Sequence, residues 1–98
     1  MSEAAFLGTL EAVIRERLER APEGSYTAGL AARGPGKVAQ KLGEEAVELA
    51  LASVLEDDGR VTAEAADLLY HLLVLLAMRG LTLGQVVAEL EARHRSKG

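Results

Sequence analysis

The sequence predicts an all-α protein, and three observations lead to that class. Alanine and leucine, both strong helix formers, are the two commonest residues, whereas isoleucine occurs once. Hydrophobic residues make up 49% of the 98 residues but aromatic residues only 3%, so the apolar residues are mostly aliphatic. They recur every three or four positions in long segments separated by glycine and proline, which is the period of amphipathic helices. We expect one domain, residues 1–98, folded as an antiparallel bundle of four main helices and completed by dimerisation.

The first helix is expected from about Glu3 to Arg20, because apolar residues recur there at helical spacing with charged residues opposite. The apolar positions are Phe6, Leu7, Leu10, Val13, Ile14 and Leu18. Pro22 and Gly24 end this helix. A non-periodic segment follows, and residues 28–33 are expected to form one or two helical turns.

The loop of Gly34, Pro35 and Gly36 separates this region from the second long helix, which we expect over about residues 37–55. Residues 56–59, Glu-Asp-Asp-Gly, predict a turn. Free backbone N–H groups at the start of the second helix are a weak signal for an anion site.

The third long helix is expected over roughly residues 62–79, with Gly80 as its stop. From residue 68 to residue 78 it is apolar nearly all round, which is typical of a helix buried on several sides. A chain of this length has few other helices to surround it. We therefore expect part of this helix to lie in a subunit interface.

The last helix begins with a predicted capping box, in which Thr82 is the N-cap and Gln85 reaches back to it. An amphipathic pattern follows. Four residues are expected to face inward: Leu83, Val86, Val87 and Leu90.

Charge and composition exclude several function classes. The formal net charge is −4, and the chain has no basic stripe that would neutralise a run of phosphates, so nucleic-acid binding is not expected. Without cysteine there is no disulfide and no thiolate metal site. The N-terminus lacks the pattern of a signal peptide, and the most apolar stretch, residues 68–78, is shorter than the ~20 residues that span a bilayer. We expect a cytoplasmic protein with no membrane partner.

The second long helix carries acidic and basic residues on one face. At 100° per residue, Lys37, Lys41, Glu44 and Glu48 fall within a narrow arc, and Glu45 lies at its edge. Carboxylates bind hard divalent cations and ammonium groups bind phosphates, so the pattern suits a metal that carries phosphate oxygens. The same spacing is also typical of an ordinary solvated face with ion pairs.

The third helix favours the metal interpretation. Glu64, Asp67 and His71 follow an i, i+3, i+7 pattern that continues into Leu75 and Met78, so the stripe changes from acidic to apolar on one face. A carboxylate on a core-facing stripe is costly to bury unless a cation meets it. Two such helices facing each other predict an oxygen-lined Mg²⁺ site. The alternative is a buried, paired aspartate and a hydrogen-bonded core histidine, and for His71 this alternative is favoured. If His71 instead has a role in the site, it orients Asp67 without binding the metal itself.

These motifs resemble a known family. The pattern Glu45-x-x-Glu48 followed by Glu64-x-x-Asp67 resembles the metal motif of the all-α, MazG-type nucleotide pyrophosphohydrolases. The resemblance is closer to the phosphoribosyl-ATP pyrophosphatases of histidine biosynthesis, and it covers nearly the whole chain. The matching segments are Ser25-Tyr26-Thr27 with Leu30, Lys41-x-Gly43-Glu44-Glu45-x-x-Glu48, and Glu64-x-x-Asp67-Leu68-x-Tyr70-His71.

The resemblance implies a Mg²⁺-dependent hydrolase that cleaves the α–β phosphoanhydride of phosphoribosyl-ATP to phosphoribosyl-AMP and pyrophosphate, the second step of histidine biosynthesis. It also implies a homodimer or a larger homo-oligomer. The implied metal ligands are Glu45, Glu48, Glu64 and Asp67. The candidate catalytic carboxylates are Glu44 and Glu45, with Glu44 as either a further ligand or the general base. The implied phosphate-binding residues are Lys37, Lys41 and Arg33. The implied substrate pocket is lined by Ser25, Tyr26 and Thr27, which otherwise form a turn that caps the next helix.

Two other functions remain open. One is a house-cleaning pyrophosphohydrolase that acts on ordinary or damaged (deoxy)nucleoside triphosphates, and the segment Ser25-Tyr26-Thr27 favours phosphoribosyl-ATP over these substrates. The other is a non-catalytic helical dimerisation or adaptor module. That function gives no reason for acidic residues on the inward stripe of the third helix.

Overall fold

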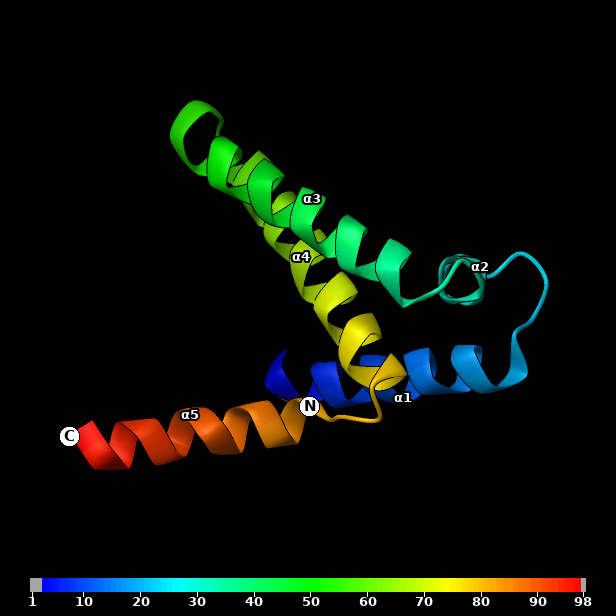
Figure 1. Cartoon of the computed structure of the whole chain (residues 1–98). Coiled ribbons are helices and arrows are strands. Elements are labelled where there is room, and N and C mark those ends of the chain that lie inside the picture. Colours follow the sequence, from blue (N-terminus) through cyan, green and yellow to red (C-terminus); the bar gives the residue numbers. More distant parts are fainter. Residues whose placement is uncertain (1–2, 98) are drawn as a thin grey trace.

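Five α-helices and no strand are present in the structure, a computed structural model that describes residues 3–97 (Figure 1). Their bounds are α1 Glu3–Arg20, α2 Tyr26–Ala32, α3 Pro35–Leu55, α4 Asp58–Met78 and α5 Leu83–Lys97. The all-α class is confirmed, with four main helices and the short α2. The bounds predicted for α1 are also confirmed, and α3 begins two residues earlier than predicted, with Pro35 at its first turn.

The centre of the fold is α4, which packs antiparallel to α3 along most of its length and crosses α1 near its C-terminal end (Figure 1). Each of the first four helices contributes to one hydrophobic core. Its buried members are Ile14, Leu30, Val38, Leu73 and Val74. This arrangement explains why the second half of α4 is apolar on several sides, and it leaves the first half of α4 facing α3 alone.

The beginning of α4 differs from the prediction. The helix starts at Asp58, four residues before Thr62, and the expected turn shrinks to the two residues that precede it. The reason is an N-cap: the carboxylate of Asp57 accepts a hydrogen bond of 2.9 Å from the backbone N–H of Arg60. The Thr62 hydroxyl donates to the carbonyl of Asp58 at 2.8 Å, inside the helix. The additional turn places Arg60 on α4, one turn before Glu64.

The end of α4 confirms the predicted stop. Gly80 has a φ of +72°, a conformation that glycine adopts without steric cost. The N–H of Leu81 donates to the carbonyl of Leu76 at 2.8 Å, and the N–H of Gly80 donates to that of Ala77 at 3.0 Å. These two bonds form a Schellman motif.

The capping box before α5 is confirmed, and it is reinforced from another helix. The Thr82 N–H donates to Gln85 Oε1 at 2.8 Å, and the Gln85 N–H donates to Thr82 Oγ1 at 3.1 Å. The Leu83 N–H donates to the carboxylate of Glu11 on α1 at 2.7 Å. The start of α5 is therefore held against α1.

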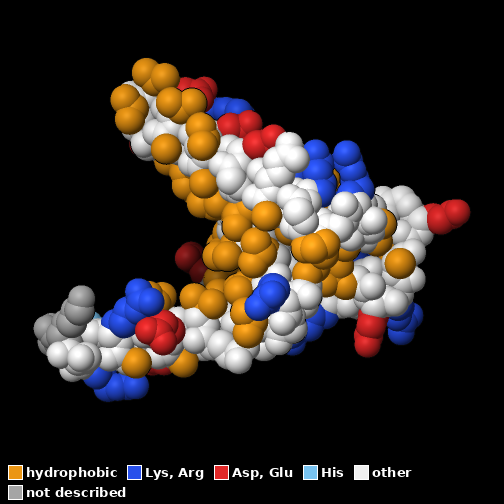
Figure 2. Space-filling view, in the orientation of Figure 1, with side chains coloured by type: hydrophobic (Ala, Val, Ile, Leu, Met, Phe, Trp, Pro, Cys, Tyr) orange, Lys and Arg blue, Asp and Glu red, His pale blue; other side chains and the backbone are white. Residues whose placement is uncertain are grey.

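Beyond its first turn, α5 extends away from the other helices (Figure 1). Val87 and Leu90, predicted to face inward, are 45% and 57% exposed, because no other helix of the chain covers them. Figure 2 shows further hydrophobic side chains at the far end of the α3–α4 pair and in the hollow between that pair and α5. Exposed apolar surface of this kind is typical of chains that associate.

Among the described residues, one helix, α4, is long and apolar enough to cross a membrane by length and composition, with a mean hydropathy of 1.6. A central core helix meets the same criterion. The packing of α4 against α1 and α3, and its buried Glu64 and His71, account for its character within the bundle.

Candidate metal and substrate site

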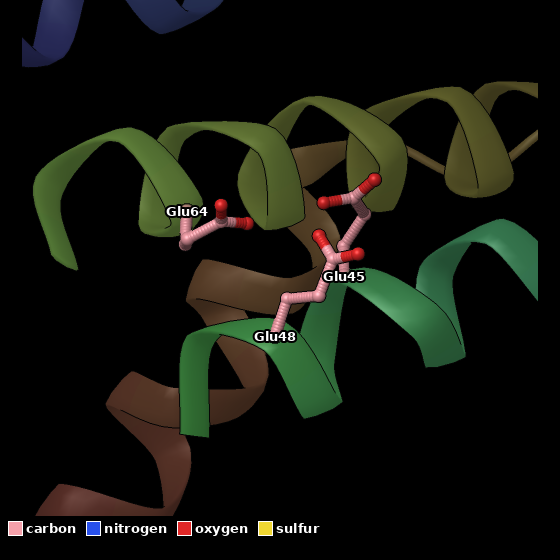
Figure 3. Close-up of side chains that lie close together, drawn as sticks. All are labelled: Glu45, Glu48 and Glu64. Atoms are coloured by element: carbon pink, nitrogen blue, oxygen red, sulfur yellow. The ribbon is translucent and has the colours of Figure 1, made fainter. Parts of the chain in front are cut away.

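Three carboxylates from α3 and α4 converge between the two helices (Figure 3). Glu45 and Glu48 lie one turn apart on α3, and Glu64 faces them from α4. One oxygen from each residue lies within 4.8 Å of the others. Glu45 and Glu64 are buried, and Glu48 is exposed. The site is therefore open to solvent on the Glu48 side and closed on the other.

The two buried carboxylates each have one oxygen with a partner and one without. Glu45 Oε1 pairs with Lys41 Nζ at 3.4 Å, and Glu64 Oε1 pairs with the guanidinium of Arg60 at 2.5 Å. Within residues 3–97, the Oε2 atoms of these glutamates are the only buried side-chain oxygens or nitrogens that lack a hydrogen-bond partner. A buried, unpaired anionic oxygen is costly. All three donors are carboxylate oxygens, so the residues fit a hard divalent cation.

The other two predicted acids lie outside this group. Asp67 is exposed, although it follows Glu64 by three residues on α4. Glu44 is also exposed, and its carboxylate accepts a hydrogen bond of 3.1 Å from Gln40 Nε2 and lies 3.9 Å from Lys41 Nζ. The structure thus brings together three of the five carboxylates singled out in the sequence.

The three phosphate-binding candidates precede the carboxylate cluster in the sequence. Lys41 lies between Glu44 and Glu45, and its hydrogen bond with Glu45 is the main reason why its pKa is raised above 10.5. The nearby Tyr26 and the two glutamates raise this pKa further, whereas partial burial opposes the shift. Lys37 lies one turn earlier on α3 and is half-buried. Arg33 is exposed and caps the C-terminus of α2.

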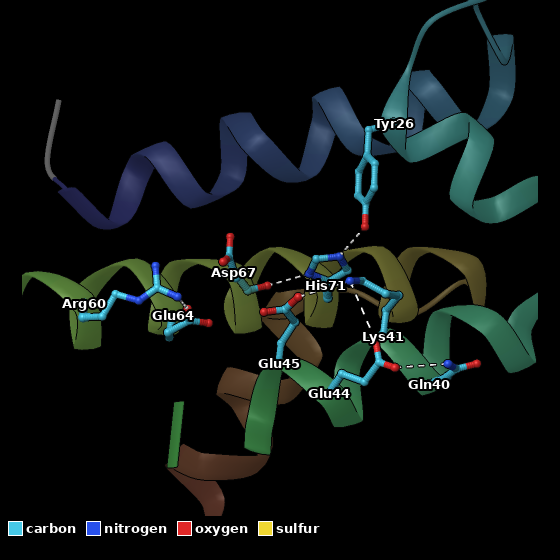
Figure 4. Close-up of polar contacts among 9 residues, drawn as sticks. All are labelled: Tyr26, Gln40, Lys41, Glu44, Glu45, Arg60, Glu64, Asp67 and His71. Atoms are coloured by element: carbon cyan, nitrogen blue, oxygen red, sulfur yellow. Dashed lines mark hydrogen bonds and ion pairs between the residues drawn. The ribbon is translucent and has the colours of Figure 1, made fainter. Parts of the chain in front are cut away.

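The buried imidazole of His71 connects α2 with α4 (Figure 4). Its Nδ1 lies 2.7 Å from the backbone carbonyl of Asp67, and since a carbonyl only accepts, Nδ1 carries the proton. In the neutral ring, Nε2 then accepts the hydroxyl proton of Tyr26 at 2.8 Å. His71 is therefore a hydrogen-bonded core histidine, the alternative considered from the sequence, and it does not orient the carboxylate of Asp67. It orients Tyr26 instead.

The remaining pocket candidates have partners within the fold. The Ser25 hydroxyl accepts a hydrogen bond of 3.1 Å from the Ala28 N–H as the N-cap of α2, which is the capping role considered as the alternative. Thr27 is buried, and its hydroxyl is hydrogen-bonded to that of Tyr70. Tyr26 is 54% exposed, so a ligand can contact its side chain while His71 orients its hydroxyl.

Arg60 was not singled out from the sequence. The available signal was a basic residue four positions before Glu64, which is the spacing of an ion pair on a helix. It was missed because the predicted helix began at Thr62, which placed Arg60 in a turn.

The family model for phosphoribosyl-ATP pyrophosphohydrolase matches residues 7–94. The chain belongs to this family. It is 57% identical over 93 residues to the phosphoribosyl-ATP pyrophosphatase of Sphingopyxis alaskensis, covering 94% of this chain and 85% of the relative. It is 56% identical over 89 residues to the enzyme of the same name from Metallosphaera sedula, covering 91% and 96% of the two chains. These matches confirm the resemblance drawn from the motifs.

A third relative is a longer protein. The chain is 56% identical over 90 residues to the histidine biosynthesis bifunctional protein HisIE of Xanthomonas campestris, covering 92% of this chain and 44% of that protein. The chain therefore matches most of two relatives and less than half of the third.

Proposed function

We propose that this chain is a single all-α nucleotide pyrophosphohydrolase domain that hydrolyses the α–β phosphoanhydride of phosphoribosyl-ATP with the help of Mg²⁺. The products are phosphoribosyl-AMP and pyrophosphate, in the second step of histidine biosynthesis. Family membership supports the substrate. The observation that carries the chemistry is that Glu45 and Glu64, whose side chains converge between α3 and α4 (Figure 3), each have one buried oxygen without a partner.

Glu45, Glu48 and Glu64 would hold the metal, and Asp67, one turn beyond Glu64, is the proposed fourth ligand. When bound there, Mg²⁺ offsets the charge of the anhydride and lowers the pKa of a coordinated water. The buried position of two ligands keeps their oxygens in place, and the exposed Glu48 leaves the substrate side open.

Neighbouring residues are assigned proton transfer, phosphate binding and contact with the rest of the substrate. Glu44 is exposed beside the cluster and is proposed to accept a proton from the attacking water. Lys41 is cationic at neutral pH, as lysine is at its ordinary pKa, and Glu45 raises that pKa further; it is proposed to bind phosphate together with Lys37 and Arg33. Tyr26, oriented by its bond to His71, is proposed to contact the nucleotide or phosphoribosyl group, with Ser25 and Thr27 shaping the turn.

The deciding experiment measures pyrophosphate release from phosphoribosyl-ATP and from a panel of deoxynucleoside triphosphates, with and without Mg²⁺. We expect Mg²⁺-dependent release from phosphoribosyl-ATP. Preference for the deoxynucleotides would instead support the house-cleaning function. If Mg²⁺ changes neither hydrolysis nor the melting temperature, the adaptor function is supported and the enzyme proposal is wrong.

Glu48→Gln tests the ligand assignment directly. Glu48 is exposed, so its replacement leaves the helices intact, and we expect turnover to be abolished while the circular dichroism spectrum is unchanged. The matched control is Glu91→Gln, which removes another exposed helical carboxylate, on α5, far from the cluster. A near-normal rate for Glu48→Gln would contradict the assignment.

We also propose that the chain acts in the cytoplasm as a homodimer or a larger homo-oligomer. Supporting this, α3 carries an apolar stripe at i, i+4, i+7 and i+8 whose members are all more than half exposed. They are Val47, Leu51, Val54 and Leu55. Light scattering on the purified chain measures the assembly.

A further inference from the structure

The two buried carboxylates of the site each form an ion pair with a cation four residues earlier on the same helix. Lys41 precedes Glu45 by four residues on α3, and Arg60 precedes Glu64 by four residues on α4. In each pair the cation contacts Oε1, and the buried Oε2 has no partner. Each of these two buried carboxylates is therefore left with one free oxygen (Figure 4).

The contact made by Arg60 is the closer of the two. Its guanidinium lies 2.5 Å from Glu64, against 3.4 Å between Lys41 and Glu45. A second carboxylate, that of Glu56 in the connection between α3 and α4, lies 3.7 Å from Arg60 Nε. The backbone of Arg60 is also held, because its N–H is capped by Asp57. Arg60 is thus anchored at both its backbone and its side chain, although the side chain is 55% exposed.

An oxygen engaged in a short, charge-assisted hydrogen bond is a poor metal ligand, since the cation and the guanidinium compete for its lone pairs. Glu64 is left with one oxygen for the metal. Mg²⁺ takes near-ideal octahedral sites through single carboxylate oxygens, whereas Ca²⁺ takes six to eight oxygens and often binds both oxygens of one carboxylate. A carboxylate limited to one oxygen therefore favours the smaller ion.

We propose that Arg60 is a specificity-determining residue, which restricts Glu64 to one metal-binding oxygen and so makes the site select Mg²⁺ over Ca²⁺. The inference rests on the metal site of the proposed function. It does not need the substrate assignment, because selection between the ions takes place before any nucleotide is bound.

The test measures binding of Mg²⁺ alone and of Ca²⁺ alone to the substrate-free protein by calorimetric titration. In Arg60→Gln, Oε1 of Glu64 becomes available, and we expect the ratio of Mg²⁺ to Ca²⁺ affinity to fall by about tenfold, as for loss of one hydrogen bond to a charged group. Arg60→Lys retains a cation and is expected to keep most of the ratio. The side chain is exposed, so the variants should fold, and circular dichroism checks this.

The control is Arg93→Gln, which removes an exposed Arg–Glu pair of the same four-residue spacing on α5, with 3.0 Å between Arg93 Nε and Glu89 Oε2. It should leave both affinities unchanged. If Arg60→Gln raises both affinities by the same factor, Arg60 contributes charge only and the proposal is wrong; an unchanged ratio also overturns it. If the wild type binds neither ion, the proposed metal site is wrong and this inference is wrong with it. If Arg60→Gln shifts the affinity ratio but the wild type does not hydrolyse phosphoribosyl-ATP, only the substrate assignment is wrong.

Discussion

Replacing Glu64 by glutamine tests whether the buried carboxylates of Glu45 and Glu64 repel each other in the metal-free protein, and whether a bound metal removes this repulsion. Glu45 and Glu64 are both buried, and the oxygens that they contribute lie within 4.8 Å of each other. Two unit charges at that separation repel by about 3.5 kcal/mol at an effective dielectric constant of ~20. The Arg60 guanidinium contacts Glu64 more closely, but its side chain is 55% exposed, so solvent screens this attraction and it offsets only part of the repulsion. We expect Glu64→Gln to stabilise the metal-free protein by about 1–2 kcal/mol, since the amide keeps the shape, removes one of two repelling charges and leaves no unpaired charged oxygen buried.

With Mg²⁺ the order reverses. A cation that binds only the folded state adds about 2.7 kcal/mol of stability at a hundred times its dissociation constant. The wild type gains this stabilisation, and the variant loses it together with its ligand. For a chain of this length, 1 kcal/mol corresponds to a shift of about 4–8 °C in melting temperature. The variant should therefore melt above the wild type in EDTA and below it in saturating Mg²⁺.

The assay is thermal denaturation followed by circular dichroism, at one protein concentration because association also affects the melting temperature. Glu91→Gln, which removes an exposed carboxylate on α5, should track the wild type in both conditions. A variant that melts below the wild type in EDTA would refute the repulsion argument. An undiminished Mg²⁺-induced rise in the variant would show that Glu64 is not a ligand.

Three further predictions follow from the contacts. Because Glu45 raises the pKa of Lys41 above 10.5, the stability that this pair contributes is complete below that pH and is lost as the pH rises through the folded-state pKa. In urea unfolding, the difference in unfolding free energy between the wild type and Lys41→Met should therefore disappear only in the alkaline range. A difference that disappears near neutral pH would contradict this. Thr27→Val strands the hydroxyl of Tyr70 and should cost about 1–3 kcal/mol in urea unfolding, whereas Thr27→Ser should cost less; equal losses would remove the hydrogen bond from the explanation. Leu51→Asp, in the exposed stripe of α3, should lower the mass measured by light scattering, and an unchanged mass would exclude this face from the assembly.

Local signals predicted most of the helix ends, because caps and stops depend on a few neighbouring residues. Gly80 and the Thr82–Gln85 box each act within one turn, and both are found as expected. The start of α4 was missed for a related reason. Asp57, Asp58 and Gly59 are typical of turns, but an aspartate is equally suited to cap a helix, and only the bond from the Arg60 N–H shows which role it takes.

The sequence predicted that α3 and α4 share the site, but not which acid of α4 faces α3. Spacing places Glu45 and Glu48 on one face of α3, and the structure keeps them together. Spacing also places Glu64 and Asp67 on one face of α4, yet Glu64 is buried and Asp67 is exposed. Residues three apart on a helix still differ by about 60° in direction, so the rotation of α4 against α3 decides which of them turns inward. That rotation is set by the packing of the core, which no local pattern contains.

The charge balance of the site gives an order to its binding events. The carboxylates of Glu45, Glu48 and Glu64 outnumber their two cationic partners, Lys41 and Arg60. Glu44 lies 3.9 Å from Lys41 and Glu56 lies 3.7 Å from Arg60, so they add to the excess of negative charge. This excess attracts a divalent cation and repels a free polyphosphate. A bound divalent cation offsets this excess, so the repulsion of an anionic substrate falls. The residues therefore favour metal first and nucleotide second, and Mg²⁺ should tighten the binding of a non-hydrolysable nucleotide analogue to the wild type but not to Glu64→Gln.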